Sequence, residues 1–575
     1  MKNIKILLIS LLAVFIASCD KMLEETPYNK VTVGNFYTTK EGVLSGVNGL
    51  YASLRDFYGN PEFWIYVCEG PSDLWTSPYG PEQFRFWTID ATNNEILQLW
   101  NNSFIAINQC NSVIEALEEN PLPGLTDELR NRSLGESKFI RAHYFYHLVQ
   151  QFGDIPMPLK PTNTVETDIK KVSSDKVWEQ IIEDLKYSIE NLPNEYSASE
   201  YGHVTKYAAE HNLARVLLTI KRDQTDLQQA LLYAEDVIES GHELMPSHTM
   251  LWDINNQKNS EVLFAVLYTK NEELNGKGNA MYKYFTSDYS SQCPGIVRAP
   301  IYGHPWTRLR STQYALDLFD SSKDNRYKEC FRNEWYINTP EYKETVFNPY
   351  TKQPEQKVWE DGELVMVTSK ERLTKEQVLD KWPVNVYLPE YMRQEIDPEK
   401  DVQSVENPNA PWPSNTRFMF YNFYSYLIKH QDPTRMATGS NGQRDVFVFR
   451  LADTYLMAGE LAHLLGDNEK AAKYINVVRK RAAVSGKEDE MKVSAADISI
   501  DFILDERARE LMGEMHRWYD LKRTGKLEEY LNDVNKNPEL AGKFKDYQVL
   551  RPIPRDQLLN VTNPDEFTQN PGYGN

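Results

Sequence analysis

The chain has 575 residues, of which 41% are hydrophobic and 12% aromatic, so it can bury a large core and is not globally disordered. Its formal net charge of -20 argues against binding to nucleic acid, because phosphates are held by Lys and Arg. The same charge argues against electrostatic attachment to an anionic membrane face.

The first 18 residues have the layout of a secretory signal peptide. Lys2 and Lys5 give a positive start, and the apolar run from Ile6 to Ile16 is broken only by Ser10. This run is well short of the ~20 apolar residues that span a bilayer. We therefore expect the leader to be cleaved rather than kept as an anchor.

A single cysteine, Cys19, follows the leader directly. Residues 16–19, IASC, resemble the bacterial lipobox, in which the cysteine is lipidated and becomes the new N-terminus. Two or more acyl chains hold a protein stably at a membrane. The acidic residues that follow resemble the surface-export signal of Bacteroidetes lipoproteins, although a solvated acidic linker has the same composition. We expect residues 19–35 to be a lipidated tether.

The other cysteines, Cys68, Cys110, Cys293 and Cys330, are widely spaced. No two have the C-x-x-C spacing of redox or zinc sites. A secreted protein can form disulfides, but a chain of this length does not need them for stability. We expect these four cysteines to be unpaired.

Two stretches have the pattern of paired antiparallel helices. In residues 445–484, apolar side chains recur at helical spacing on either side of Gly466 and Asp467, which are suited to end one helix and begin the next. Residues 203–242 repeat the pattern, with small alanines on both predicted helices. The pattern resembles a tetratricopeptide unit.

Three further amphipathic segments fit the same scheme, at residues 43–54, 99–117 and 178–192. We therefore predict a mostly α-helical protein whose scaffold contains about four tetratricopeptide-type helix pairs. The scaffold is expected to come from both ends of the chain, at about residues 36–55, 93–245 and 444–530.

Weak periodicity marks the rest of the chain, at about residues 56–92 and 250–443. The longer stretch is rich in Pro, Trp, Tyr and Asn, with short apolar runs such as EVLFAVLYT. This composition predicts long loops, short strands and small helices laid against the scaffold. Ligand sites are often carried by such loops, so we expect these regions to face the ligand.

Three segments resemble the SusD/RagB family of outer-membrane nutrient-binding lipoproteins. Residues 135–161, GESKFIRAHYFYHLVQQFGDIPMPLKP, carry the family's RA and FGDIP blocks. Residues 503–527, ILDERARELMGEMHRWYDLKRTGKL, are similar to a family motif over almost their whole length. Residues 550–573 hold the PIP and QNPGY signatures of the family's C-terminus. With the lipobox, the resemblance covers essentially the whole chain in the expected order.

The resemblance implies a single SusD-like domain over residues 36–575, held to the cell outer membrane by its lipid and facing the exterior. It implies a SusC-type TonB-dependent transporter as partner, to which a captured oligo- or polysaccharide is delivered. It implies no catalysis and no cofactor. Relatives of the RagB type take peptides or glycopeptides, and this alternative stays open.

The family usually draws its binding residues from an early loop and from the start of the central region, here residues 70–87 and 284–310. A neutral sugar offers flat C–H faces and hydroxyls, so exposed Trp or Tyr must be accompanied by polar side chains. The alternative for each ring is that it wedges a loop onto the scaffold. The ligand-binding candidates are Asp73, which resembles an acidic residue common in the family's early loop, with Trp75, Tyr79, Tyr289, Tyr302, Trp306 and Arg308.

Motifs for catalysis or metal binding are incomplete. HELMPSH at residues 242–248 has Pro246 where a zinc protease needs its second histidine. Residues 253–261 alternate oxygen-bearing side chains, but Lys258 occupies the glycine position of an EF-hand, so only a loose calcium site stays open. We expect no metal site.

Glu506, Glu510 and Glu514 share one face of a predicted helix. A surface glycosidase, the remaining enzymatic alternative, needs two carboxylates across a sugar cleft. Neighbouring arginines such as Arg507 and Arg509 favour structural ion pairs instead. We therefore expect a binding protein and not an enzyme.

Overall fold

The computed structural model describes residues 36–59, 62–70, 72–271, 273 and 275–574. The predicted signal peptide, Cys19 and the predicted tether lie outside the described residues. Within the described residues there are 21 helices, which account for about 45% of the chain, and the strands are few and short. The predicted mostly α-helical class is confirmed.

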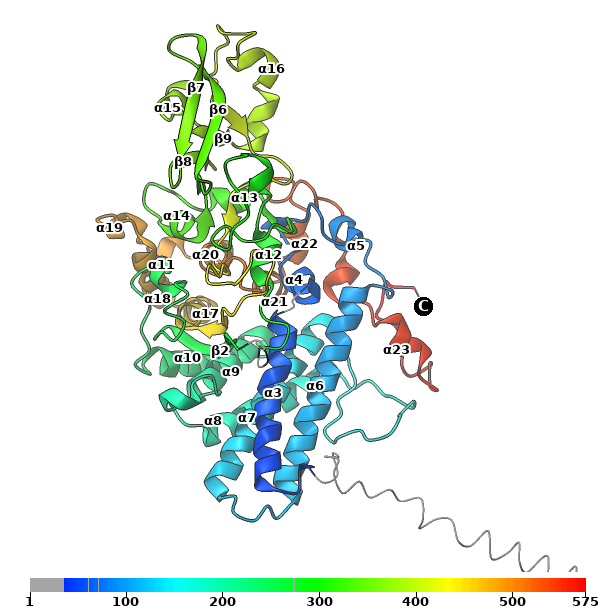
Figure 1. Ribbon diagram of the computed structural model, residues 1–575. Helices are drawn as coiled ribbons and strands as arrows, with labels where there is room; N and C mark the ends of the chain where they lie inside the picture. Colours follow the sequence, from blue (N-terminus) through cyan, green and yellow to red (C-terminus); the bar gives the residue numbers. More distant parts are fainter. Residues whose placement is uncertain (1–35, 60–61, 71, 272, 274, 575) are drawn as a thin grey trace, which may run out of the picture.

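Eight helices form the scaffold. They are α3 Lys40–Gly59, α6 Asn94–Glu119, α7 Asp127–Phe152, α8 Ser174–Asn191, α9 Lys206–Ile220, α10 Gln224–Ile238, α17 Leu451–Leu464 and α18 Asn468–Ala482. Each helix packs against the next one in this order, including α10 against α17 (Figure 1). The segment between α10 and α17 is therefore an insertion between two helices that are neighbours in space.

Side-chain caps and glycines fix the ends of these helices. Asn93 Oδ1 accepts a hydrogen bond from the Ile96 N–H at 2.9 Å and begins α6, and Asp467 Oδ1 accepts one from the Lys470 N–H at 2.9 Å and begins α18. Gly153, with φ +72°, follows the end of α7, and Gly466, with φ +86°, follows α17. The predicted turn at Gly466 and Asp467 is confirmed.

The strands belong mainly to the insertion. Antiparallel pairing joins β12 Val446–Arg450 to β2 Val262–Val266, β1 Trp75–Thr76 to β3 Arg310–Ser311, and β4 Phe331–Arg332 to β11 Tyr426–Leu427. A four-stranded sheet has the order β10 Thr416–Phe418, β9 Asn385–Leu388, β8 Leu364–Thr368 and β5 Glu334–Tyr336. The hairpin of β6 Glu341–Asn348 and β7 Gln353–Glu360 projects beyond this sheet, at the top of Figure 1.

Short helices complete the fold. They are α4 Glu62–Cys68, α5 Glu82–Phe86, α11 His248–Leu251, α12 Met281–Phe285, α13 Gln313–Asp317, α14 Arg326–Cys330, α15 Lys375–Leu379, α16 Pro398–Asp401, α19 Glu488–Met491, α20 Ile500–Leu511, α21 Arg517–Arg523, α22 Leu527–Leu531 and α23 Arg555–Leu559, with 3₁₀ turns η1 Ala198–Glu200, η2 Tyr289–Ser291, η3 Glu390–Gln394, η4 Ala495–Asp497 and η5 Asp546–Val549. α4 is buried over Phe63–Cys68, so its sequence shows no polar face.

The segment at residues 503–527 forms two helices rather than one. α20 and α21 are separated by a turn in which Gly513 has φ +79° and Met515 has φ +67°. Both helices bury apolar side chains in the core, since Leu504 and Trp518 are each at most 1% exposed. The turn brings the two helices together, and Arg507 of α20 forms an ion pair with Asp520 of α21, with an Nε–Oδ2 distance of 2.8 Å.

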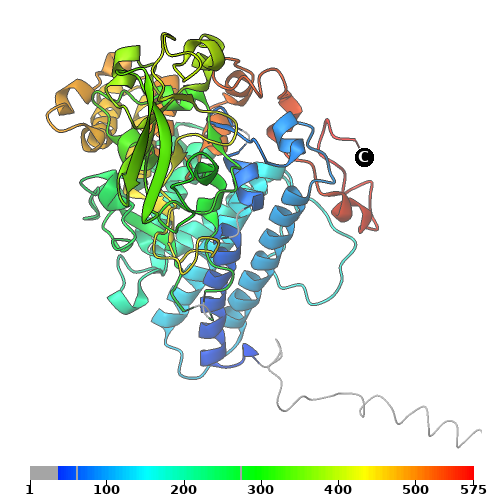
Figure 2. The ribbon, with the colours of Figure 1, turned by 45° about the horizontal axis from the view of Figure 1, so that its top comes forward.

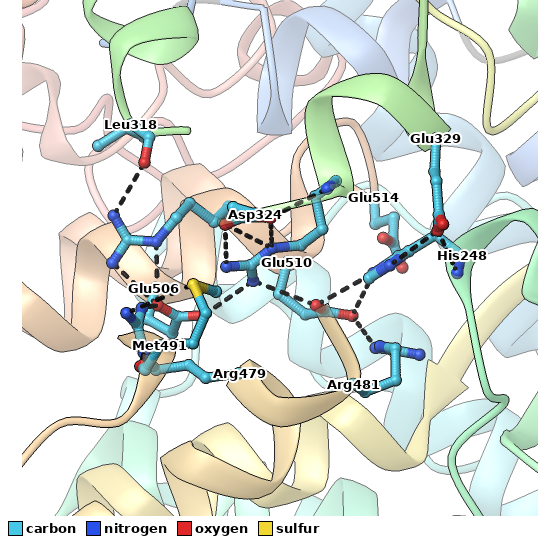
Figure 3. A network of polar contacts seen from close by, with 12 residues as sticks. His248, Leu318, Asp324, Glu329, Arg479, Arg481, Met491, Glu506, Glu510 and Glu514 are labelled. Atoms are coloured by element: carbon cyan, nitrogen blue, oxygen red, sulfur yellow. Dashed lines mark hydrogen bonds and ion pairs between the residues drawn. The ribbon is translucent and has the colours of Figure 1, made fainter. Parts of the chain in front are cut away.

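A buried ionic network, here called the α20 network, joins this segment to the rest of the protein. Glu510 contacts Arg450 at 2.7 Å and Arg326 at 3.3 Å, while His248 approaches it at 3.2 Å. Figure 3 shows Arg481 reaching Glu510 and Arg479 reaching Glu506 from α18. The carboxylates of Glu506, Glu510 and Glu514 are at most 3% exposed, so the predicted structural ion pairs are confirmed.

The four described cysteines are all buried, and no disulfide joins them. Within the described part of the chain, no helix is both long and apolar enough to cross a membrane. In the same residues, no three His, Cys, Asp or Glu side chains gather in a way that could hold a metal ion.

Replacing Glu510 by glutamine should lower the free energy of unfolding by about 3–5 kcal/mol, because Arg326, Arg450 and Arg481 would lose a buried counter-charge. Glu490→Gln is the control, since Glu490 pairs with Lys487 at an exposed position and such pairs contribute little. Guanidinium unfolding of both variants measures the difference. Equal stability of the two variants would contradict this role for the network.

The stability of the protein should fall in mild acid. Burial lowers the pKa of His143 and His248 to about 3 and that of His430 and His516 to about 4. In the unfolded chain these histidines have the ordinary pKa of about 6.5. Between these pH values the unfolded chain binds protons that the folded chain does not, so the free energy of unfolding falls as the pH falls. Burial alone would raise the pKa of Glu514, but Arg450 and Lys429 outweigh it and lower the pKa to about 2. Thermal unfolding should therefore shift to lower temperature as the pH falls from 7 to 4. A constant midpoint over this range would contradict it.

Candidate ligand-binding site

The early loop is attached to the C-terminal helices by buried polar contacts. Asp73 is 0% exposed and forms a two-point ion pair with Arg517 of α21, at 2.9 Å and 2.6 Å. Trp75 is 1% exposed, and its indole N–H donates to Glu69 Oε1 at 2.7 Å. The prediction that Asp73 and Trp75 bind a ligand at the surface is therefore corrected. The carboxylate and the ring are both buried, and their contacts hold the loop in place.

Two predicted aromatic residues of the central region are also in a core. Tyr289 is 0% exposed and donates to the Gly303 carbonyl at 2.8 Å, and Tyr302 is 4% exposed and donates to the Tyr336 carbonyl at 2.8 Å. Their ring centroids lie 5.3 Å apart. Neither ring presents a face to solvent, so the expectation of stacking platforms here is corrected as well.

Three predicted residues do lie near the surface. Tyr79 is 45% exposed, and Arg308 donates to its backbone carbonyl. Trp306 is half-buried, and its ring lies 5.1 Å from Tyr284 in an edge-to-face arrangement. The structure adds Tyr421, 38% exposed, whose ring lies 5.0 Å from that of Tyr79. The early loop and the central region thus meet at Tyr79, as the sequence predicts.

A cavity of about 360 Å³, here called the lower cavity, opens beside this meeting point. The strand pair β1–β3 forms one edge, with Thr76 opposite Arg310, and η3 forms another. Tyr391 of η3 is 41% exposed and presents a ring at the rim. The lining includes the aromatic residues Tyr314, Tyr391, Phe420 and Tyr424, and the polar residues Arg310, Gln313, Glu390, Gln394, Asn535 and Glu539.

Three of the four charged side chains in the lower cavity pair with one another, while the fourth, Lys536, lies over the ring of Tyr314 at 3.8 Å from its centroid. Arg310 reaches Glu390 at 2.6 Å and Glu539 at 3.0 Å, and its Nε donates to Thr76 Oγ1 at 3.2 Å. One guanidinium therefore lies between two carboxylates, which fixes the orientation of all three. A neutral ligand can be hydrogen-bonded by such a group without the cost of bringing a counter-charge.

Two hydroxyls in the lining are free to bind a ligand. Tyr424 Oη and Ser311 Oγ have no hydrogen-bond partner among the described residues, although the side chains are only 4% and 8% exposed. Burial keeps the pKa of Tyr424 well above its ordinary value, so its hydroxyl stays protonated and can donate. Hydroxyls of this kind beside aromatic rings suit a ligand that has both flat faces and hydroxyl groups.

Sequence reasoning missed four aromatic residues of the lower cavity. Phe420 and Tyr424 lie in residues 417–430, an aromatic-rich segment whose composition fits a core strand or a partner interface equally well. Tyr391 and Tyr314 lie in short helical elements that have no periodicity long enough to predict. For these four aromatic residues, the high aromatic content of residues 417–430 is the one feature of the sequence that could have indicated a site.

The model of the SusD family matches residues 260–573, and a second family model, described as "Starch-binding associating with outer membrane", matches residues 74–218. SusD-like protein P25 of Formosa agariphila is 24% identical over 572 residues, which covers 97% of each chain. A SusD-like protein of Bacteroides ovatus is 26% identical over 272 residues, 46% of this chain and 49% of the relative.

Solved structures share the fold. A laminarin-binding SusD-like protein superposes with a TM-score of 0.65 at 21% identity, covering 93% of this chain and 100% of the other. Surface glycan-binding protein A from Bacteroides thetaiotaomicron, in complex with laminarihexaose, gives a TM-score of 0.63 at 18% identity with the same coverage. At these identities the likeness shows the fold.

The effects of two substitutions on the free energy of unfolding distinguish the buried role of Trp75 from the surface position of Tyr79. Trp75→Ala should lower the free energy of unfolding by about 3–5 kcal/mol, because it empties a buried site of a large ring. Tyr79→Ala, at an exposed ring in the same loop, should change it by about 0.5 kcal/mol or less. Urea unfolding of both variants measures this, and a fully stable Trp75→Ala protein would contradict the core assignment.

Proposed function

Because the chain belongs to the SusD family, we propose that it binds oligo- or polysaccharide at the lower cavity and delivers it to a SusC-type TonB-dependent transporter. The observation that carries the proposal is the combination, in one cavity, of four aromatic residues with free hydroxyls and paired charges. Aromatic rings stack on the C–H faces of a sugar, and the polar groups bind its hydroxyls. Two solved structures with this fold are named as binding laminarin or laminarihexaose.

Three residues of the predicted site remain part of this proposal. Arg308 holds the Tyr79 backbone and Tyr421, next to Phe420 of the cavity lining, packs against the Tyr79 ring, while Trp306 precedes Arg308 by two residues in the same loop. They extend the binding surface from the cavity along the loops. A ligand of several sugar units fits such a surface better than a monosaccharide.

We also propose how the chain is anchored and divided. Residues 1–18 are a signal peptide, Cys19 carries the lipid, residues 19–35 form the tether and residues 36–575 form one domain. The protein lies at the outer membrane, in agreement with the description of the second family model, and it faces the exterior. No charge-based membrane contact is needed, since the lipid provides the attachment.

The proposed role is binding without catalysis. Glu390 and Glu539 are the carboxylates of the lower cavity, and both are ion-paired with Arg310. Glu506, Glu510 and Glu514 are buried in the α20 network and are held ionised by their cationic partners. A glycosidase needs a protonated acid beside the scissile bond, and the three carboxylates of the α20 network do not meet that need.

Calorimetric titration of the soluble chain, starting at Asp20, against plant, host and microbial polysaccharides tests the glycan proposal. For the polymer that binds, Tyr391→Ala should weaken the affinity about tenfold or more, since it removes a stacking face at the rim. Trp306→Ala should weaken it as well. Tyr233→Ala, on α10 and away from the cavity, is the matched control and should bind as the wild type does.

The outcomes distinguish the alternatives. Failure of the wild type to bind any polymer would contradict the glycan proposal and would favour a peptide ligand. Release of reducing sugar during the titration would contradict the absence of catalysis. Copurification of a TonB-dependent transporter with the lipidated protein from outer membranes tests the delivery step separately.

A further inference from the structure

The insertion carries a small protrusion with a core of its own. It contains the sheet β10–β9–β8–β5, the hairpin β6–β7 and the helices α15 and α16. Val378, Val386, Leu388 and Met392 are each 0% exposed and form the centre of this core. In Figures 1 and 2 the hairpin and α16 lie on the side of the insertion away from the lower ends of α3 and α6. The protrusion is therefore a rigid body and not an extended loop.

A second cavity, here called the upper cavity, lies between the hairpin and the segments that follow β9. Its volume is about 390 Å³, similar to that of the lower cavity. Trp382 lines it and is half-buried, with one edge near Tyr350 at a centroid distance of 6.0 Å. A tryptophan in the wall of an open cavity offers a flat apolar surface to a ligand.

Asn415 supplies a free acceptor in the upper cavity. The side chain is 3% exposed, and its Nδ2 donates to the carbonyls of Val378 at 3.0 Å and Val384 at 2.9 Å. These two carbonyls fix the orientation of the amide, because a flipped amide would turn its oxygen toward them. Asn415 Oδ1 is thus an acceptor with no partner among the described residues. Leaving a buried acceptor unpaired is unfavourable, and a hydrogen-bond donor on a ligand would remove this cost.

Gln403 supplies a second free acceptor. Its Nε2 donates to the Ala410 carbonyl at 3.1 Å, and its backbone N–H donates to the Trp412 carbonyl at 2.9 Å, so both the side chain and the backbone are held in place. Gln403 Oε1 has no partner among the described residues. Two fixed amide oxygens in one cavity require an occupant that carries hydrogen-bond donors.

We propose that the upper cavity is a second carbohydrate subsite. Trp382 stacks on one sugar ring, and the free oxygens of Asn415 and Gln403 accept hydrogen bonds from its hydroxyls. Neutral amide oxygens favour hydroxyl donors of a sugar over an anionic group, which they would repel. The inference rests on the proposed function for the class of ligand, and it adds a site outside the lower cavity.

The two cavities lie toward opposite ends of the parallel strands β9 and β10. Asn385 and Asn415 line the upper cavity at the start of these strands, whereas Glu390 and Phe420 line the lower cavity beyond their ends. Asn415 and Phe420 are five residues apart, and five residues of extended chain span roughly 17 Å, a distance that several sugar units bridge. One polysaccharide chain can therefore occupy both cavities, and joining two weak subsites raises the overall affinity for a long polymer.

Hydrogen–deuterium exchange of the soluble chain with laminarihexaose, xylohexaose and maltohexaose locates the subsite. With the hexasaccharide that binds, residues 382–385 and 402–417 should be protected in addition to the lower cavity. Trp382→Ala and Gln403→Ala should remove this protection, while Trp382→Phe should keep most of it because a flat ring remains. Gln353→Ala, on an exposed part of β7, is the matched control for Gln403→Ala.

Affinity electrophoresis with the parent polysaccharide gives the second readout. In a Tyr391→Ala background, adding Trp382→Ala should weaken the remaining retardation about fivefold or more, and adding Gln353→Ala should not. If Trp382→Ala and Gln403→Ala change neither protection nor retardation, while Tyr391→Ala abolishes binding, the second subsite is wrong and the proposed function stands. If the wild type binds none of the hexasaccharides or polymers, both are wrong.

Discussion

Glu510 lies where three parts of the chain meet, and its buried carboxylate has partners in each of them. Arg326 comes from α14 in the insertion, Arg450 from the end of β12, and Arg481 from α18. A buried ion pair adds little net stability over apolar packing, but removing one partner is costly. The α20 network therefore contributes more to specificity than to net stability. It favours the one placement of the insertion against the scaffold that pairs all these charges.

The same turn that ends α20 also fixes the early loop. The Gly513 N–H donates to Glu69 Oε1 at 2.9 Å, and the same oxygen accepts from the Trp75 indole. Burial raises the pKa of Glu69 to about 7, so this link is held by hydrogen bonds more than by charge. Four residues later, Arg517 binds Asp73. The C-terminal helices thus position both regions that border the lower cavity, although they contribute little to its lining.

Long helices were predictable because their apolar side chains recur over several turns and their ends carry caps or glycines, as at Gly153 and Gly466. The charge pattern of residues 503–527 predicted structural ion pairs with neighbouring arginines, as between Arg509 and Glu506, but it could not predict Arg326 and Arg450, which are distant in sequence. Composition could not tell which loop aromatics reach solvent. Trp75 and Tyr79 are four residues apart in the same Gly- and Pro-rich loop, yet tertiary contacts bury the first and expose the second.

The α20 network and the two cavities differ in whether their buried polar groups have partners. In the α20 network, every carboxylate has a cationic partner, which leaves no capacity for a ligand. In the two cavities, by contrast, four neutral groups have no hydrogen-bond partner among the described residues: Tyr424 and Ser311 in the lower cavity, Asn415 and Gln403 in the upper one. Neutral groups cost less to leave unpaired than charges. A surface built from such groups and from aromatic rings can bind and release a neutral, hydroxyl-rich polymer, and the proposed delivery to a transporter requires such release.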